Sequence, residues 1–121
     1  MFGGGHPLFY SKEIGERLDF VAVHFYPRKR EVDKAVKALK AYDIGKPLVV
    51  EETFPPRCGQ DELIRFIHES RTIADGWFSF YWGTPADELR AKQDKTLGDA
   101  INASWYDAFQ SLGVGIVAGS D

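Results

Sequence analysis

Three short apolar runs divide the chain and have the length of β-strands. Each is rich in valine or aromatic side chains, and together they cover residues 20–26, 47–52 and 77–82. The segments between them, residues 31–42 and 61–74, place apolar side chains at helical spacing. The pattern therefore predicts a chain in which strands and helices alternate.

The two segments between the strands predict helices that each bury one side. In the first, Val32, Val36 and Leu39 fall on one face, and lysines form the opposite, solvated face. Gly45 ends this helix, and Pro47 opens the following strand, where its missing N–H does least harm. In the second helix, the side expected to be buried consists of Leu63, Ile64, Phe66, Ile67 and Ile73.

A third helix is predicted after the last apolar run. Thr96-Leu97-Gly98-Asp99 resembles a capping box, with Asp in place of the usual Glu. A polar stretch, residues 83–95, connects it to the third strand, and the glycine-rich tail of residues 113–121 is assigned to no element. The helix itself carries Leu97, Ile101, Trp105 and Phe109.

The order βαβαβα predicts the α/β fold class with a parallel sheet, because such alternation favours parallel pairing and right-handed crossovers. A chain of 121 residues is long enough for one compact domain, residues 1–121. In folds of this class, ligands bind at the carboxyl ends of the strands. The polar or aromatic residues predicted at those ends are His24, Tyr26, Glu52 and Trp82.

Alternation of side chains assigns faces along the first two strands. Ala22, His24 and Tyr26 share one face of the first strand, and the other face is uniformly apolar, which suits packing against helices. In the second strand the same rule separates Glu52 from Glu51. Alternation alone does not say which of the two faces inward; with Glu52 facing the pocket, Glu51 is expected to point towards the helix layer.

Composition and charge exclude several classes of function. Hydrophobic residues make up 44% and charged residues 27% of the chain, as in globular domains. The net charge is −3 with both signs interspersed, so nucleic acid is not an expected partner. No apolar run approaches the roughly 20 residues of a membrane span, and the N-terminus lacks the regions of a signal peptide. The single cysteine, Cys58, cannot form an internal disulfide, and no thiol-protease signature surrounds it.

The strand-end residues resemble the C-terminal part of a clan A (β/α)8 barrel glycoside hydrolase, near family 5, the cellulase and mannanase family. In that family the sixth strand often ends in His-x-Tyr, as His24-Phe25-Tyr26 does here. The seventh often runs from Lys-Pro to a nucleophilic Glu, similar to residues 46–52, and the eighth often ends in a Trp, similar to Trp82. The resemblance spans residues 18–109 and implies a partial TIM barrel of three C-terminal βα units.

By this resemblance, the chain belongs to a retaining glycosidase that cleaves a polysaccharide or oligosaccharide without a cofactor. Glu52 would attack the anomeric carbon, Tyr26 would hydrogen-bond this nucleophile, and His24 would line the same subsite. Trp82 would contact the sugar ring, and Phe54 is a candidate sugar platform in the loop after the second strand. A carboxylate suits such a role when donors hold it ionised and oriented.

Two features depart from the family pattern. The family usually follows its nucleophile with an aromatic residue and Gly, whereas Thr53-Phe54-Pro55 follows here. A retaining glycosidase also needs a second carboxyl group about 5–5.5 Å from the first. In the family this group belongs to an Asn-Glu pair, and the sequence contains none. The chain alone is therefore expected to be inactive, and to need a missing N-terminal half-barrel or self-association through exposed sheet edges.

Other interpretations of these residues stay open. The chain is alternatively a small, complete α/β domain that binds a ligand or partner without catalysis. Tyr26, His24 and Trp82 suit core packing as well as a sugar subsite, and Glu52 suits a salt bridge at a strand end. Glu51 and Glu52 with His24 lack a reliable metal-ligand spacing, so no metal site is predicted.

Overall fold

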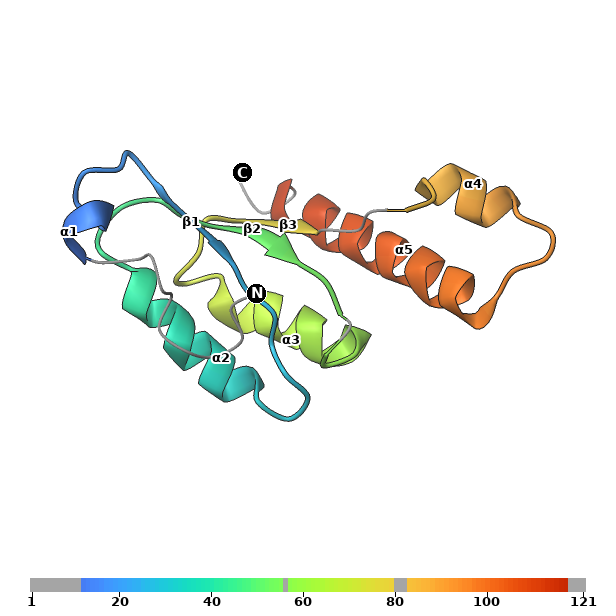
Figure 1. The fold of residues 1–121 in the computed structure, drawn as a ribbon, viewed down its shortest axis with the longest axis horizontal. Coiled ribbons are helices and arrows are strands. Elements are labelled where there is room, and N and C mark those ends of the chain that lie inside the picture. The colour runs from blue at the N-terminus through green and yellow to red at the C-terminus, as the bar shows by residue number, and fades with distance from the viewer. Residues whose placement is uncertain (1–11, 56, 80–82, 118–121) are drawn as a thin grey trace. The chain divides into compact units, whose positions relative to one another are not determined.

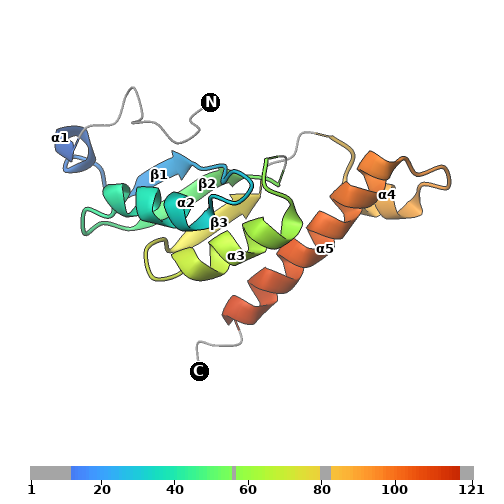
Figure 2. The same cartoon turned by 90° about the horizontal axis from the view of Figure 1, so that it is seen from below.

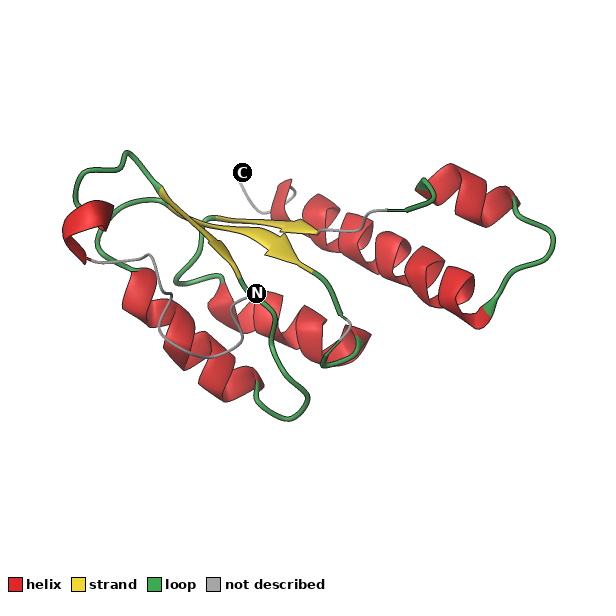
Figure 3. Cartoon of the chain, viewed as in Figure 1, coloured by secondary structure: helices red, strands yellow, loops and turns green. Residues whose placement is uncertain are grey.

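The computed structural model describes residues 12–55, 57–79 and 83–117 (Figure 1). Figure 3 shows its strands in yellow and its helices in red. In chain order the elements are α1 (Lys12–Gly15), β1 (Val21–His24), α2 (Val32–Leu39), a 3-10 turn η1 (Lys40–Tyr42), β2 (Leu48–Thr53), α3 (Gln60–Ser70), β3 (Gly76–Ser79), α4 (Ala86–Ala91) and α5 (Leu97–Val117).

The strands form a parallel sheet in the order β1-β2-β3, so β2 is the central strand. Helices α2 and α3 lie on the same face of this sheet (Figures 1 and 2). Parallel strands joined by helices confirm the predicted α/β class. The finer assignment, a fragment of a (β/α)8 barrel, stays a prediction.

The chain divides into two compact units, residues 1–80 and residues 81–121. The sheet with α2 and α3 belongs to the first unit, and α4 packs beside α5 in the second. A single domain over the whole chain stays a prediction. None of the helices in the described residues combines the length and hydrophobicity that a membrane span needs.

The core of the first unit lies between the sheet and its two helices. The rings of Phe25 and Phe66 stack there with centroids 5.6 Å apart and planes inclined by 6°. Ile64 and Ile73, both expected on the buried side of the second helix, are only partly buried. For Ile73 the reason is that α3 ends at Ser70, which takes Ile73 out of helical phase. The buried side chains around the stacked rings are Val21, Leu48 and Val50 from the strands, Val32, Ala35 and Leu39 from α2, and Leu63 and Ile67 from α3.

The connection between α2 and the central strand has its glycine and its proline at the predicted places. Helix α2 ends at Leu39 and tightens into η1, and Gly45 then has a φ of +78°, which favours glycine. Strand β2 begins directly after Pro47. The ammonium of Lys46 donates to the carbonyl oxygen of Glu16 at 2.6 Å, and so ties the start of β2 to the segment before β1.

The second unit contains one helix that the sequence pattern predicts and one that it does not. The capping box is confirmed: the Asp99 N–H donates to Thr96 Oγ1 at 3.1 Å, and the Thr96 N–H donates to Asp99 Oδ2 at 2.8 Å. The hydrogen bond from Lys92, together with those from Thr96, lowers the pKa of Asp99 to about 2. Helix α4 was not predicted in the polar stretch, although Pro85 and two acidic first-turn residues are typical of a helix start. Its buried residue is Leu89.

Strand β2 contains one extra residue relative to both of its neighbours. Val23 pairs with Val50 and His24 pairs with Glu52. The pairing therefore advances by two residues along β2 and by one residue along β1. The β2–β3 ladder shifts register in the same stretch, between Val50 and Thr53. This is a β-bulge, which breaks the strict alternation of side chains and turns neighbouring side chains towards the same face.

The third strand is shorter in the structure than in the prediction. Strand β3 covers Gly76–Ser79, and the remainder of the apolar run, including Trp82, lies outside the described residues. The predicted strand-end position of Trp82 is therefore untested.

Candidate functional site

Three of the predicted site residues meet at the carboxyl ends of β1 and β2. The Tyr26 hydroxyl donates a hydrogen bond to Glu52 Oε1. His24 Nδ1 lies 3.2 Å from Glu52 Oε2, so groups from the end of β1 and from the segment after it face both oxygens of this carboxylate. His24 Nε2 lies 3.1 Å from Glu51 Oε1. The structure thus brings His24, Tyr26 and Glu52 together and adds Glu51 to them.

Backbone pairing positions these side chains. His24 is the last residue of β1, and the next N–H, that of Phe25, donates to the Glu52 carbonyl oxygen at 2.9 Å. Phe25 turns its ring to Phe66 on α3, which leaves the side chains on either side of it to face the other way. Tyr26 and His24 consequently reach Glu52 from the same strand end.

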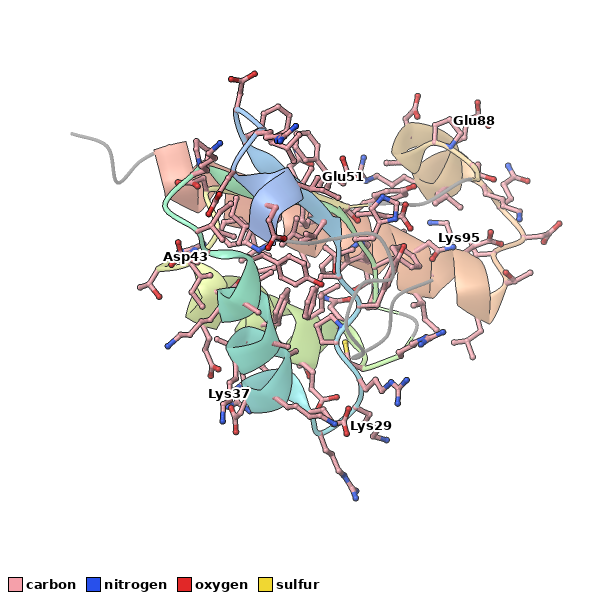
Figure 4. All side chains as sticks on the ribbon, turned by 60° about the vertical axis from the view of Figure 1, so that its left-hand side comes forward. Lys29, Lys37, Asp43, Glu51, Glu88 and Lys95 are labelled. Atoms are coloured by element: carbon pink, nitrogen blue, oxygen red, sulfur yellow. The ribbon has the colours of Figure 1, made fainter. Side chains whose placement is uncertain are left out.

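The prediction for Glu51 was wrong. Alternation directed this side chain towards the helices, but it is exposed and contacts His24. Figure 4 shows Glu51 on the side of the sheet opposite to the helix that carries Lys37. The bulge in β2 is the physical reason, because the extra residue puts Glu51 and Glu52 within reach of the same imidazole.

The environment of Tyr26 keeps its phenol protonated. Burial raises the pKa of Tyr26 well above its ordinary value, and the hydrogen bond to the Glu52 carboxylate raises it further. The charge of Arg57 acts in the opposite direction. A protonated phenol is a donor, so Tyr26 can hold the Glu52 carboxylate in one orientation.

Exposure differs between the two carboxylates. The Glu52 side chain is 23% exposed, whereas Glu51 is 47% and His24 is 46% exposed. Glu52 is therefore the better shielded carboxylate, and it is also the one that Tyr26 contacts. A partly desolvated carboxylate that accepts a hydrogen bond on one oxygen can act as a nucleophile or as a base.

The loops after β1 and β2 are joined beside this cluster. The Lys29 N–H donates to the Arg57 carbonyl oxygen at 2.9 Å. Phe54, the predicted sugar platform, directly follows β2 and is partly buried. Arg57 was missed by the sequence analysis, because no pattern in its own loop indicates that its charge reaches Tyr26.

A cavity adjoins Tyr26 on the flank of α2. Its wall from the segment after β1 includes Arg28, and its wall from α2 includes Glu31 and Lys34, which lie 3.4 Å apart as an ion pair. Figure 4 shows Lys29, the neighbour of Arg28, at the opposite end of α2 from Asp43. The cavity is lined by Phe25, Tyr26, Pro27, Arg28, Glu31, Lys34, Ala35 and Ala38.

Within the described residues, no cluster of three or more His, Cys, Asp or Glu side chains has the arrangement of a metal site. Both ring nitrogens of His24 already face carboxylate oxygens. Neither nitrogen therefore offers a free lone pair to an ion without breaking one of these contacts.

Cys58 lies in the loop after β2 and is buried, with 6% of its surface exposed. Burial, followed by the charge of Glu62, raises the pKa of the Cys58 thiol to about 11. Because the thiolate is the reactive form, this thiol is poorly nucleophilic at neutral pH. The same shift lowers the stability of the folded state as pH rises from the ordinary thiol value towards 11, because folding opposes ionisation.

We expect alkylation of Cys58 by iodoacetamide at pH 8 to be slower by at least about tenfold in the folded chain than in urea, because both the thiolate fraction and access are reduced. The measurement is the rate of mass increase under the two conditions, with Cys58→Ala as the blank. Equal rates in the folded and unfolded chain would contradict the buried position of the thiol.

No protein-family model matches the chain, and no curated protein and no solved structure matches it at a significant level.

Proposed function

We propose that the chain forms the nucleophile-bearing part of a retaining glycoside hydrolase that acts on a polysaccharide or oligosaccharide, with Glu52 as the nucleophile. The observation that carries the proposal is the hydrogen bond from Tyr26 to Glu52 at the carboxyl end of the central strand. Such a donor holds a carboxylate in a fixed orientation, which a nucleophile needs.

In the proposed reaction, a Glu52 oxygen forms a bond to the anomeric carbon while the bond from that carbon to the leaving-group oxygen breaks. A second carboxyl group gives its proton to the leaving-group oxygen. Water then attacks the same carbon and loses a proton to that carboxylate, while the ester bond to Glu52 breaks and the sugar is released with retained configuration. Tyr26 keeps its proton through both steps, since its raised pKa disfavours the phenolate. His24, Phe54 and Trp82 are the proposed sugar contacts.

The proposal assigns the proton donor to a carboxyl group outside these 121 residues. A retaining enzyme needs that group about 5–5.5 Å from the nucleophile, on the other side of the glycosidic bond. In this arrangement Glu51 cannot act as the proton donor, because the ring of His24 lies between Glu51 and Glu52. The acid would come from another segment of a longer protein or from a partner chain.

Substrates with different leaving groups test the assigned nucleophile and the external proton donor separately. Dinitrophenolate leaves without protonation, so the chain should release about one equivalent of it from a dinitrophenyl β-glucoside, β-mannoside or β-cellobioside. Cello- and manno-oligosaccharides need the acid and should stay intact. The measurement is absorbance after rapid mixing, together with chromatography of the oligosaccharides. Glu52→Gln should abolish the release.

Glu69→Gln is the matched control, because Glu69 pairs with Arg65 on α3. It should release dinitrophenolate as the unchanged chain does. Release that survives Glu52→Gln would contradict the assigned nucleophile, and release from none of the three glycosides would favour a non-catalytic α/β binding domain. Cleavage of the oligosaccharides by the chain alone would contradict the external acid.

A further inference from the structure

The imidazole of His24 lies between two carboxylates that are adjacent in sequence. Nε2 is 3.1 Å from Glu51 and Nδ1 is 3.2 Å from Glu52. Strict alternation would put these two glutamates on opposite faces of the sheet. The extra residue in β2 brings both to one ring, and Glu51 lies on the face opposite to the helices (Figure 4).

The three side chains and Tyr26 form one continuous chain of contacts. Glu51 contacts His24, His24 contacts Glu52, and Tyr26 donates to the second oxygen of Glu52. His24 is 46% exposed, so packing alone does not fix the rotation of its ring. The contact to Glu51 is the interaction on the far side of the ring that can fix it.

We propose that Glu51 is a positioning residue for Glu52, and that it acts through the ring of His24. Glu51 anchors Nε2, so that Nδ1 is held against Glu52 Oε2. Glu52 then has both oxygens held in place, one by His24 and one by Tyr26. The inference rests on the proposed function only in taking Glu52 as the nucleophile.

The two glutamates are coupled because they share one ring. A neutral imidazole carries one N–H and donates to one carboxylate, whereas the imidazolium donates to both. The bonds of an imidazolium to two carboxylates are charge-assisted at both nitrogens. Removal of Glu51 therefore allows the ring to rotate. This rotation disrupts the contact between Nδ1 and Glu52.

Proton NMR of the His24 ring in the whole chain tests this coupling without any sugar. The spectra are recorded at pH 5. We expect both His24 ring N–H signals in the unchanged chain, assigned by their absence in His24→Gln. In Glu51→Ala the Nδ1–H should exchange with water about tenfold faster or more, as loss of a charge-assisted bond predicts.

Two further variants make the test specific. Glu51→Gln keeps an acceptor oxygen at the same distance and should retain slow Nδ1–H exchange. Glu69→Ala removes a glutamate elsewhere in the first unit, where it pairs with Arg65, and should leave both His24 signals unchanged. Backbone amide spectra of all variants should match the unchanged chain, which separates a local effect from partial unfolding.

Nδ1–H exchange in Glu51→Ala within twofold of the unchanged chain would overturn the positioning role. Absence of slowly exchanging ring protons in the unchanged chain would do the same. In the dinitrophenolate assay, Glu51→Ala should lower the rate constant of release roughly 10- to 100-fold and keep its amplitude near one equivalent. An unchanged rate constant would count against the inference. Because NMR needs no sugar, failure of the proposed function would leave the ring measurement valid.

Discussion

Replacement of Phe66 by alanine should lower the free energy of unfolding of the first unit by about 3–5 kcal/mol. Phe66 is fully buried and stacks on Phe25 between α3 and the sheet, so its removal leaves a cavity at the centre of the core. A unit of this size has a total stability of roughly 4–12 kcal/mol at 0.05–0.15 kcal/mol per residue. The loss is therefore a large share of the whole, and it also removes the ring that orients the end of β1.

The measurement is urea unfolding followed by NMR signals of residues in β1, β2 and α3, so that the second unit does not mask the result. Phe78→Ala is the matched control, because Phe78 is 62% exposed on β3 and should change the unfolding free energy by less than about 0.5 kcal/mol. Equal losses for the two variants would show that the core does not lie between the sheet and α3.

Hydrophobic spacing was sufficient to predict the architecture of the first unit. Val32 and Leu39 of α2, and Leu63, Phe66 and Ile67 of α3, are buried where the helical period places them. The strands pair in parallel, as predicted. When short apolar strands alternate with helices, few other arrangements bury the apolar surfaces of both strands and helices. Such patterns act over many residues at once, so a local irregularity does not disturb them.

The second unit was predicted less completely. The Thr96–Asp99 capping box is a local signal and is confirmed by its hydrogen bonds. Helix α4 has only six residues and one buried side chain, Leu89, so it lacks the repeated apolar spacing on which a prediction depends. On α5, Trp105 is buried, but Leu97 and Ile101 are 79% and 52% exposed.

Three residues of the candidate site were placed at neighbouring strand ends from the sequence, and Glu51 was not among them. His24, Tyr26 and Glu52 meet as strand alternation suggests. The position of Glu51 depends on one extra residue in β2, and alternation contains no information about where such a residue is inserted. Two adjacent glutamates at the end of an apolar strand are the signal that could have raised the question, since only one of them can follow strict alternation.

Glu52→Gln should abolish covalent capture of a 2-deoxy-2-fluoroglycosyl fluoride by the chain. In this reaction, a carboxylate oxygen bonds to the anomeric carbon as the carbon–fluorine bond breaks, and fluoride leaves without needing a proton donor. The fluorine at C2 slows hydrolysis of the ester, so the glycosyl-enzyme accumulates. A glutamine amide is no such nucleophile, and the expected effect is loss of the adduct rather than a partial decrease.

Two variants serve as controls for adduct formation. Glu69→Gln should form the adduct as readily as the unchanged chain, because Glu69 lies on α3 and pairs with Arg65. Tyr26→Phe removes the donor to Glu52 Oε1 and should slow adduct formation by roughly 10- to 100-fold without moving its position. A label that moves to another residue in Tyr26→Phe would contradict the role given to the phenol.

Peptide mass spectrometry after incubation with the gluco and manno forms of this fluoride identifies the attacking residue directly. We expect one fluorosugar per chain, attached as an ester to Glu52 and absent from Glu52→Gln. Attachment to Glu51, or no adduct with either sugar, would contradict the assignment of Glu52 as the nucleophile of a retaining glycosidase.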